Sequence, residues 1–247
     1  MIFRRIKAHV EKENWFAVFI DFCIVVVGVF IGIQVANWNQ ARAERDLAAD
    51  LVSRMISEAM ATRGELKQYT LVHQVISDDA ARLAVSLKDK DACLANVSAL
   101  KTLIVGISDF PPIRFSLSNA EQAMDTGSLA LIPSIKVRNS IQVIVDEMAF
   151  IDRQWQRYVQ VKQYAGQEAQ KSAGVALTGR GEVDVLELGA YDPGNFELLT
   201  PERICGNTEI IALVSDAVVT QKIYVDYLKQ VEGALEIYLA TLNAEAG

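Results

Sequence analysis

Histidine is scarce in this chain, with only His9 and His73 among 247 residues. His9 lies in the N-terminal tail, and no metal-ligand spacing surrounds His73. A phosphate-binding loop, a GxSxG elbow and a dinucleotide-binding fingerprint are also missing. We therefore expect no enzyme activity, no catalytic residue, no metal and no cofactor, and we interpret His73 as a surface or groove histidine.

Basic side chains are outnumbered, since 24 lysines and arginines face 31 aspartates and glutamates. The first fourteen residues are an exception, because they hold four basic residues against two acidic ones. Residues 37–247 carry 20 basic and 28 acidic side chains. An acidic domain gains nothing from counterion release on a phosphate backbone, so we exclude nucleic acid as a partner.

Proline is absent from the first 110 residues, and residues 15–36 contain only two strongly polar side chains, Asp21 and Gln34. A helix of this length spans roughly 33 Å, enough for the hydrocarbon core of a bilayer. Trp15 and Trp38 stand at its ends as interfacial anchors. Because apolar residues surround the helix instead of forming a stripe, the segment predicts a transmembrane helix rather than a buried core helix.

A cleaved signal peptide is the alternative, because the triplet Ala41-Arg42-Ala43 resembles a processing site. The apolar run is longer than the roughly 7 to 15 residues of a signal-peptide centre, so we expect an uncleaved anchor. By the positive-inside rule, residues 1–14 are a cytoplasmic tail, 15–36 the transmembrane helix and 37–247 the main domain. In a bacterium with two membranes, this places the protein in the inner membrane with the domain in the periplasm.

The domain is predicted to be mainly α, with the membrane helix continuing outward to about residue 88 into a bundle of long helices. Shorter helices are expected over 91–107 and over 118–127, the second with a capping box at Ser118 and Glu121. Two later segments carry apolar seams that alternate spacings of three and four. The seams are Val137, Ile141, Ile144, Met148, Ile151, Trp155 and Tyr158, and then Ile210, Val214, Ala217, Gln221, Tyr224, Leu228, Val231, Leu235, Tyr238 and Leu242. Gln221 is the one polar member.

Glycine and proline gather in residues 174–206, which predicts an irregular segment within the helical domain. The run 192–195, Asp-Pro-Gly-Asn, is a strong turn signal. Residues 183–188 alternate between apolar and polar side chains, which also fits a short β-strand. Thr200-Pro201-Glu202 is typical of a helix start.

Of three cysteines, Cys23 lies in the apolar segment, while Cys93 and Cys205 lie in the domain. In an oxidising periplasm we expect Cys93 and Cys205 to form a disulfide. Such a bridge closes a loop of about 110 residues and stabilises by roughly 4 to 5 kcal/mol in the chain-entropy model. Two unrelated buried thiols remain the alternative.

The membrane helix carries a candidate interaction face: Asp21, Val25, Gly28, Gly32 and Val35 recur at helical spacing. The GxxxG element of Gly28 and Gly32 allows close backbone approach between helices in lipid. A carboxylate in a spanning helix is costly and usually faces protein or water, so Asp21 points to the same face. The alternative is that Asp21, six residues beyond Trp15, reaches the cytoplasmic headgroups.

The run from Asn14 to Asn39, NWFAVFIDFCIVVVGVFIGIQVANWN, closely resembles the N-terminal segment of an uncharacterised family of bacterial single-pass membrane proteins. The weaker run Thr126 to Ile132, followed by Val137-Arg138, is similar to a turn that leads into a helix in that family. The family is a domain of unknown function, so the resemblance implies location and architecture and no activity.

Together these patterns predict a scaffold or accessory subunit whose partners are the lipid bilayer and either an integral membrane protein or a second copy of the chain. The alternative is a periplasmic small-molecule sensor acting on a membrane partner. A sensor is expected to contain a closed pocket with a few convergent polar groups. A scaffold is expected to expose apolar surface that another protein covers.

Overall fold

The computed structural model describes residues 15–107, 115–178 and 193–246, most of which are helical. The α-helices are α2 (Trp15–Ser86), α3 (Lys90–Ala95), α4 (Val97–Gly106), α5 (Ser118–Asp125), α6 (Ile135–Ala173) and α7 (Thr208–Ala246). The chain divides into two compact units, residues up to Leu51 and residues from Val52 onward, and α2 contributes to both. The predicted mainly α fold is confirmed.

Helix α2 is one uninterrupted helix of 72 residues. No proline breaks it, and it ends close to the predicted residue 88. Within the first unit, the apolar side chains described from Phe19 to Val35 are exposed on every side of the helix. The described part of the chain contains one helix long and apolar enough to cross a membrane, and this is it.

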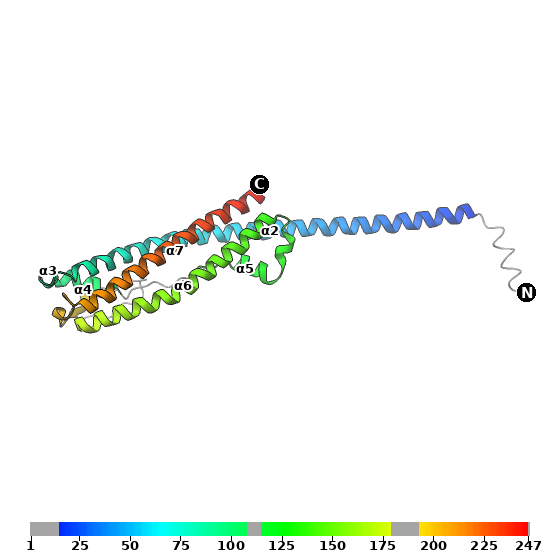
Figure 1. Ribbon diagram of the computed structural model, residues 1–247. Coiled ribbons are helices and arrows are strands. Elements are labelled where there is room, and N and C mark those ends of the chain that lie inside the picture. The colour runs from blue at the N-terminus through cyan, green and yellow to red at the C-terminus, as the bar shows by residue number, and fades with distance from the viewer. Residues whose placement is uncertain (1–14, 108–114, 179–192, 247) are drawn as a thin grey trace, which may run out of the picture. The chain divides into compact units, whose positions relative to one another are not determined.

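The second unit is built on three long helices, α6, α7 and the part of α2 after residue 51 (Figure 1). Helices α6 and α7 run antiparallel: the ring of Phe150 meets that of Tyr227 at 5.0 Å, and Gln230 donates to Glu147. All ten seam positions on α7 are buried. On α6 six of the seven are buried, and the seventh, Trp155, is half-buried. The two periodic patterns therefore mark the core.

The region between α2 and α5 differs from the expected single helix over residues 91–107. The structure has two helices there, because Asn96 leaves helical geometry at φ −128° and caps α4 by accepting from the Ala99 N–H at 3.4 Å. Asp89 similarly caps α3 through the N–H groups of Asp91 and Ala92. Asp89 and Asn96 thus each mark the start of a helix, a signal that the composition of the segment does not show.

The capping box expected at Ser118 is wrong, because Ser118 is already the first residue of α5. Its hydroxyl donates to Glu58 of α2 at 2.6 Å, and the Asn119 N–H donates to the same carboxylate at 3.0 Å. A carboxylate from a distant part of the chain therefore satisfies the N-terminus of α5. Gly127, in left-handed geometry at φ 74°, follows the helix and leads into the 3-10 turn η1 (Ser128–Leu131).

The irregular segment holds a small antiparallel sheet of β1 (Val175–Leu177) and β2 (Phe196–Leu198), with Ala176 opposite Glu197. The 3-10 turns η2 (Pro193–Asn195) and η3 (Pro201–Arg203) flank β2, and η3 stands where a helix start was predicted. The strand suggested for residues 183–188 lies outside the described residues. Gly174 ends α6 in left-handed geometry at φ 67°, and a Cβ there would stand 2.9 Å from the Thr200 hydroxyl.

The end of the bundle near this sheet has its own apolar core, which includes Leu83, Leu87, Leu100, Ile104, Ile210 and Val214. Cys93 and Cys205 lie in this core and are joined by a disulfide, with α-carbons 5.8 Å apart. This is the pair that the cysteine arrangement predicted. The Gly206 N–H also donates to the carbonyl of Leu87, just after α2, at 2.7 Å. The segment before α7 is therefore attached to α3 by the disulfide and to the end of α2 by this hydrogen bond.

Candidate functional site

The most unusual feature of the second unit is a layer of polar and aromatic side chains in the middle of the bundle core. We call it the central polar layer. It consists of Tyr69 and His73 from α2, Trp155, Tyr158 and Lys162 from α6, and Gln221 and Tyr224 from α7. His73, Lys162 and Gln221 are each 0% exposed, which is exceptional for side chains of this polarity.

Gln221 connects the three helices of the layer. Its Nε2 lies 3.0 Å from His73 Nδ1 and donates to the His73 carbonyl at 3.2 Å. Its Oε1 accepts from the Tyr158 hydroxyl at 2.5 Å. One amide on α7 is therefore bonded to α2 through its nitrogen and to α6 through its oxygen.

Aromatic rings enclose the imidazole of His73. Tyr69 lies 4.3 Å away between ring centroids, Tyr224 5.2 Å and Tyr158 5.5 Å, with Trp155 at 6.2 Å. Tyr158 and Tyr224 are stacked on each other at 4.5 Å. Rings in such numbers exclude water, and a low local dielectric strengthens the hydrogen bonds of the layer.

Burial keeps the phenols of Tyr69 and Tyr224 neutral. Burial raises the pKa of Tyr69 and of Tyr224 far above that of an exposed tyrosine, and the neighbouring phenol of Tyr69 raises that of Tyr224 further. The amine of Lys162 lies 6.0 Å from the centre of the Tyr158 ring, on which a cation is favoured. The layer thus combines neutral hydroxyls, one imidazole and one amine in a dry setting.

The placement of His73 corrects the interpretation of this residue as a surface or groove histidine. On α2 it belongs to a buried series that includes Leu66, Thr70, Ser77 and Ala80 at spacings of three and four. The series was missed because Leu66 is the only large apolar residue among these five, so an apolar pattern does not reveal it. Gln221 in the seam of α7 was the one visible signal that the core contains a polar partner.

The candidate membrane face lies in the first unit, on the exposed part of α2. Asp21 is exposed, and a Cβ added at Gly28 or Gly32 meets nothing within 4 Å. Val25 and Val35 are also exposed, at 62% and 52%. The face is thus open for a partner or for lipid.

Of the two interfacial tryptophans, only Trp38 has a described side chain. It is 58% exposed, and the guanidinium of Arg42 lies 6.0 Å from its ring centre. A tryptophan paired with a cation just beyond an apolar segment suits the headgroup region of a bilayer. The side chain of Trp15 lies outside the described residues.

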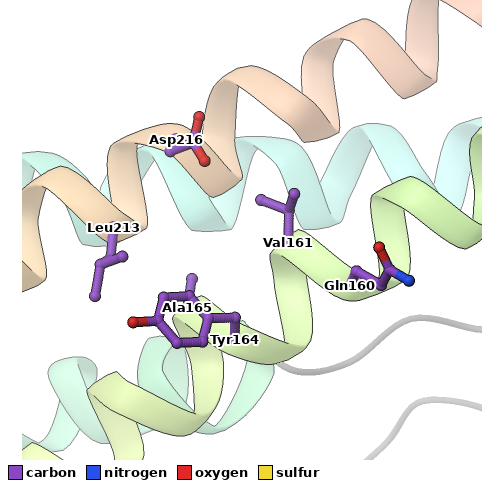
Figure 2. Close-up of a pocket in the computed structure, with 6 residues that line it drawn as sticks. All are labelled: Gln160, Val161, Tyr164, Ala165, Leu213 and Asp216. Atoms are coloured by element: carbon purple, nitrogen blue, oxygen red, sulfur yellow. The ribbon is translucent and has the colours of Figure 1, made fainter.

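A surface groove between α6 and α7 is the second candidate site. Its volume is about 210 Å³, and Figure 2 shows the six residues that line it: Gln160, Val161, Tyr164, Ala165, Leu213 and Asp216. The walls are mainly apolar, and the polar ends of Gln160, Tyr164 and Asp216 point in different directions (Figure 2). Such an arrangement offers an apolar contact surface rather than a site that orients a small ligand.

Among the residues that the structure describes, no group of three histidine, cysteine, aspartate or glutamate side chains could hold a metal ion. Within the described part of the chain, the central polar layer brings several titratable side chains together in the core. Comparison of the chain with protein-family models, curated proteins and solved structures gives no match, so the family resemblance of its N-terminal segment stays a prediction.

Proposed function

We propose that the chain is a non-enzymatic, single-pass inner-membrane protein that acts as a scaffold or accessory subunit of a larger membrane complex. The observation that carries the proposal is the exposure of the apolar segment of α2. Phe22, Val29 and Phe30 are 64%, 57% and 61% exposed, and their neighbours on every side are similarly open. In water so many exposed apolar side chains are unfavourable, whereas a bilayer or a partner helix covers them.

Two features support a periplasmic position for the helical unit. The tail before the apolar segment holds four basic residues, whereas Arg42 and Arg45 are the two just beyond its other end, and the positive-inside rule places the more basic side in the cytoplasm. The disulfide between Cys93 and Cys205 belongs to an oxidising compartment. Both features favour the same orientation.

Orientation is tested by protease digestion of cells that express the full chain. We expect protease added to spheroplasts to remove the domain after residue 45 and to leave the tail and the membrane helix, since the domain faces the periplasm. Inverted inner-membrane vesicles should protect it. Protection in spheroplasts with digestion in inverted vesicles would reverse both the orientation and the localisation.

Association in the membrane is assigned to the face formed by Asp21, Val25, Gly28, Gly32 and Val35. Small residues let two backbones approach, and in lipid this packing replaces the missing hydrophobic driving force. Asp21 adds a carboxylate that a protein surface accommodates better than lipid does. The partner is an integral membrane protein or a second copy of the chain.

The test replaces Asp21 with leucine and Gly28 or Gly32 with isoleucine, one at a time, in the full chain. We expect each glycine variant to lower the amount of partner or second copy recovered in mild detergent at least about tenfold, because one lost interaction of about 1.4 kcal/mol has that effect. Val26→Ile on the opposite side of the helix is the matched control. Unchanged recovery in all three variants would mean that the chain associates through its helical unit and not through this face of the membrane helix.

The alternative function, a small-molecule sensor, requires a pocket whose polar groups converge on a ligand. The groove between α6 and α7 is open to solvent and its polar ends diverge (Figure 2). Its apolar wall instead suits a contact with another protein. The described surface therefore supports the scaffold or accessory function better than ligand capture.

A further inference from the structure

The orientation of the Gln221 amide defines the protonation state of His73. A backbone carbonyl can only accept a hydrogen bond, so the amide atom that lies 3.2 Å from the His73 carbonyl must be the nitrogen. That same nitrogen lies 3.0 Å from Nδ1 of the imidazole. Nδ1 must therefore accept, which makes His73 a neutral imidazole with its proton on Nε2.

A proton on Nδ1 is incompatible with this arrangement. It would place an N–H donor against the NH₂ donor of Gln221, and the amide would have to rotate so that Oε1 faces the imidazole. In the structure the Tyr158 hydroxyl donates to Oε1 at 2.5 Å. The rotation would turn NH₂ toward that hydroxyl instead and would remove the bond to the His73 carbonyl. Protonation of one side chain thus disturbs bonds on all three helices.

The side chains around His73 also disfavour its protonation. The titratable or charged side chains around the imidazole are Tyr69 on α2, Tyr158 and Lys162 on α6, and Tyr224 on α7, with Asp152 of α6 acting on Tyr224. Lys162 and His73 both contact the ring of Tyr158. His73 is 0% exposed, and burial in this dry layer disfavours the charged form of the imidazole.

We propose that the central polar layer is an acid-sensitive device: uptake of a proton by His73 breaks the Gln221 bridge and loosens α2 from the α6–α7 pair. The helical unit is then closed at neutral pH and opens as its compartment acidifies. The device belongs to the fold and does not depend on the scaffold function.

The stability of the helical unit depends on pH because the folded and unfolded chains differ in their affinity for a proton on His73. An exposed histidine in the unfolded chain takes up a proton near pH 6.5, whereas the folded layer excludes it. The stability that depends on a neutral His73 is therefore complete above about pH 6.5 and decreases as the pH falls below that value. One proton taken up on unfolding lowers the folding equilibrium constant up to about tenfold for each unit of pH.

The experiment measures urea unfolding of the full chain in mild detergent micelles between about pH 8 and 5.5, above the range in which exposed carboxylates titrate. The chain has only two histidines, so His9→Gln is the matched control for His73→Gln. We expect the wild type and His9→Gln to lose up to about tenfold in the folding equilibrium constant per pH unit below about 6.5. His73→Gln should lack the part of this loss that comes from His73 and so show a shallower slope below about pH 6.5, and the same slope in both variants would overturn the proposal.

A second measurement holds even where His73→Gln fails to fold. In the His9→Gln chain labelled with ¹⁵N in histidine, nuclear magnetic resonance at neutral pH reports on His73 alone. We expect the nitrogen shifts of a neutral ring protonated on Nε2, which persist below the pH at which a free histidine is charged. A ring protonated on Nδ1, or a charged ring at neutral pH, would overturn the proposal.

Discussion

Replacing both Cys93 and Cys205 with alanine is expected to lower the free energy of unfolding by about 4 to 5 kcal/mol. The bridge joins residues 112 apart, so its loss frees a long loop in the unfolded chain. For a domain of this size the change corresponds to a fall of roughly 10 to 15 °C in the melting temperature. Circular dichroism of the full chain in detergent micelles, during urea or thermal unfolding, measures it.

Cys23→Ala is the matched control, because Cys23 is the free cysteine of the described structure and lies in the apolar segment. We expect this variant to unfold as the wild type does. A reductant should destabilise the wild type and Cys23→Ala and leave the double variant unchanged. A wild type that ignores the reductant and matches the double variant would exclude the bridge.

The long elements of this fold were predictable because each carries a periodic signal over many turns. The seam that begins at Ile210 and ends at Leu242 is buried at all ten positions, as expected when apolar residues recur at one face of a helix. The exposed apolar segment of α2 was predictable for a different reason, because its apolar residues surround the helix instead of lining one face. Neither conclusion requires knowledge of tertiary contacts.

The features that sequence did not reveal depend on partners distant in the chain. The cap of α5 comes from Glu58, about 60 residues before it, so the local pattern at Ser118 suggested a different donor and acceptor. The short strands β1 and β2 have three residues each, too few for an alternation signal. Their pairing depends on the turn at Gly174 and on contacts with Thr200.

The central polar layer could not be predicted from the sequence. Its members come from distant parts of the chain, and the bonded pair His73 and Gln221 is separated by 148 residues. On α2 the buried positions near His73 include Thr70 and Ser77, whose polarity suggests a solvated face. Only when three helices are placed together does a polar residue on each become a buried network.

Replacing Gln221 with leucine is expected to lower the free energy of unfolding by about 2 to 4 kcal/mol, although it completes the apolar seam of α7. Leucine removes the donor used by His73 Nδ1 and the acceptor used by the Tyr158 hydroxyl. Each loss within a dry core costs about 1 to 3 kcal/mol, more than one additional apolar side chain recovers. Urea unfolding at pH 8, where His73 is neutral in both states, measures the change.

Gln230→Leu is the matched control, since Gln230 lies on the same helix and bonds to Glu147 at an exposed position. We expect a change within about 0.5 kcal/mol there, as for most surface substitutions. The double variant His73→Leu and Gln221→Leu should be more stable than the two single effects predict, because removing both partners leaves no unmet imidazole nitrogen. Strict additivity, or a Gln221→Leu chain as stable as the wild type, would mean that the bridge contributes nothing. The layer would then be ordinary core, and the acid-sensitive device would lose its physical basis.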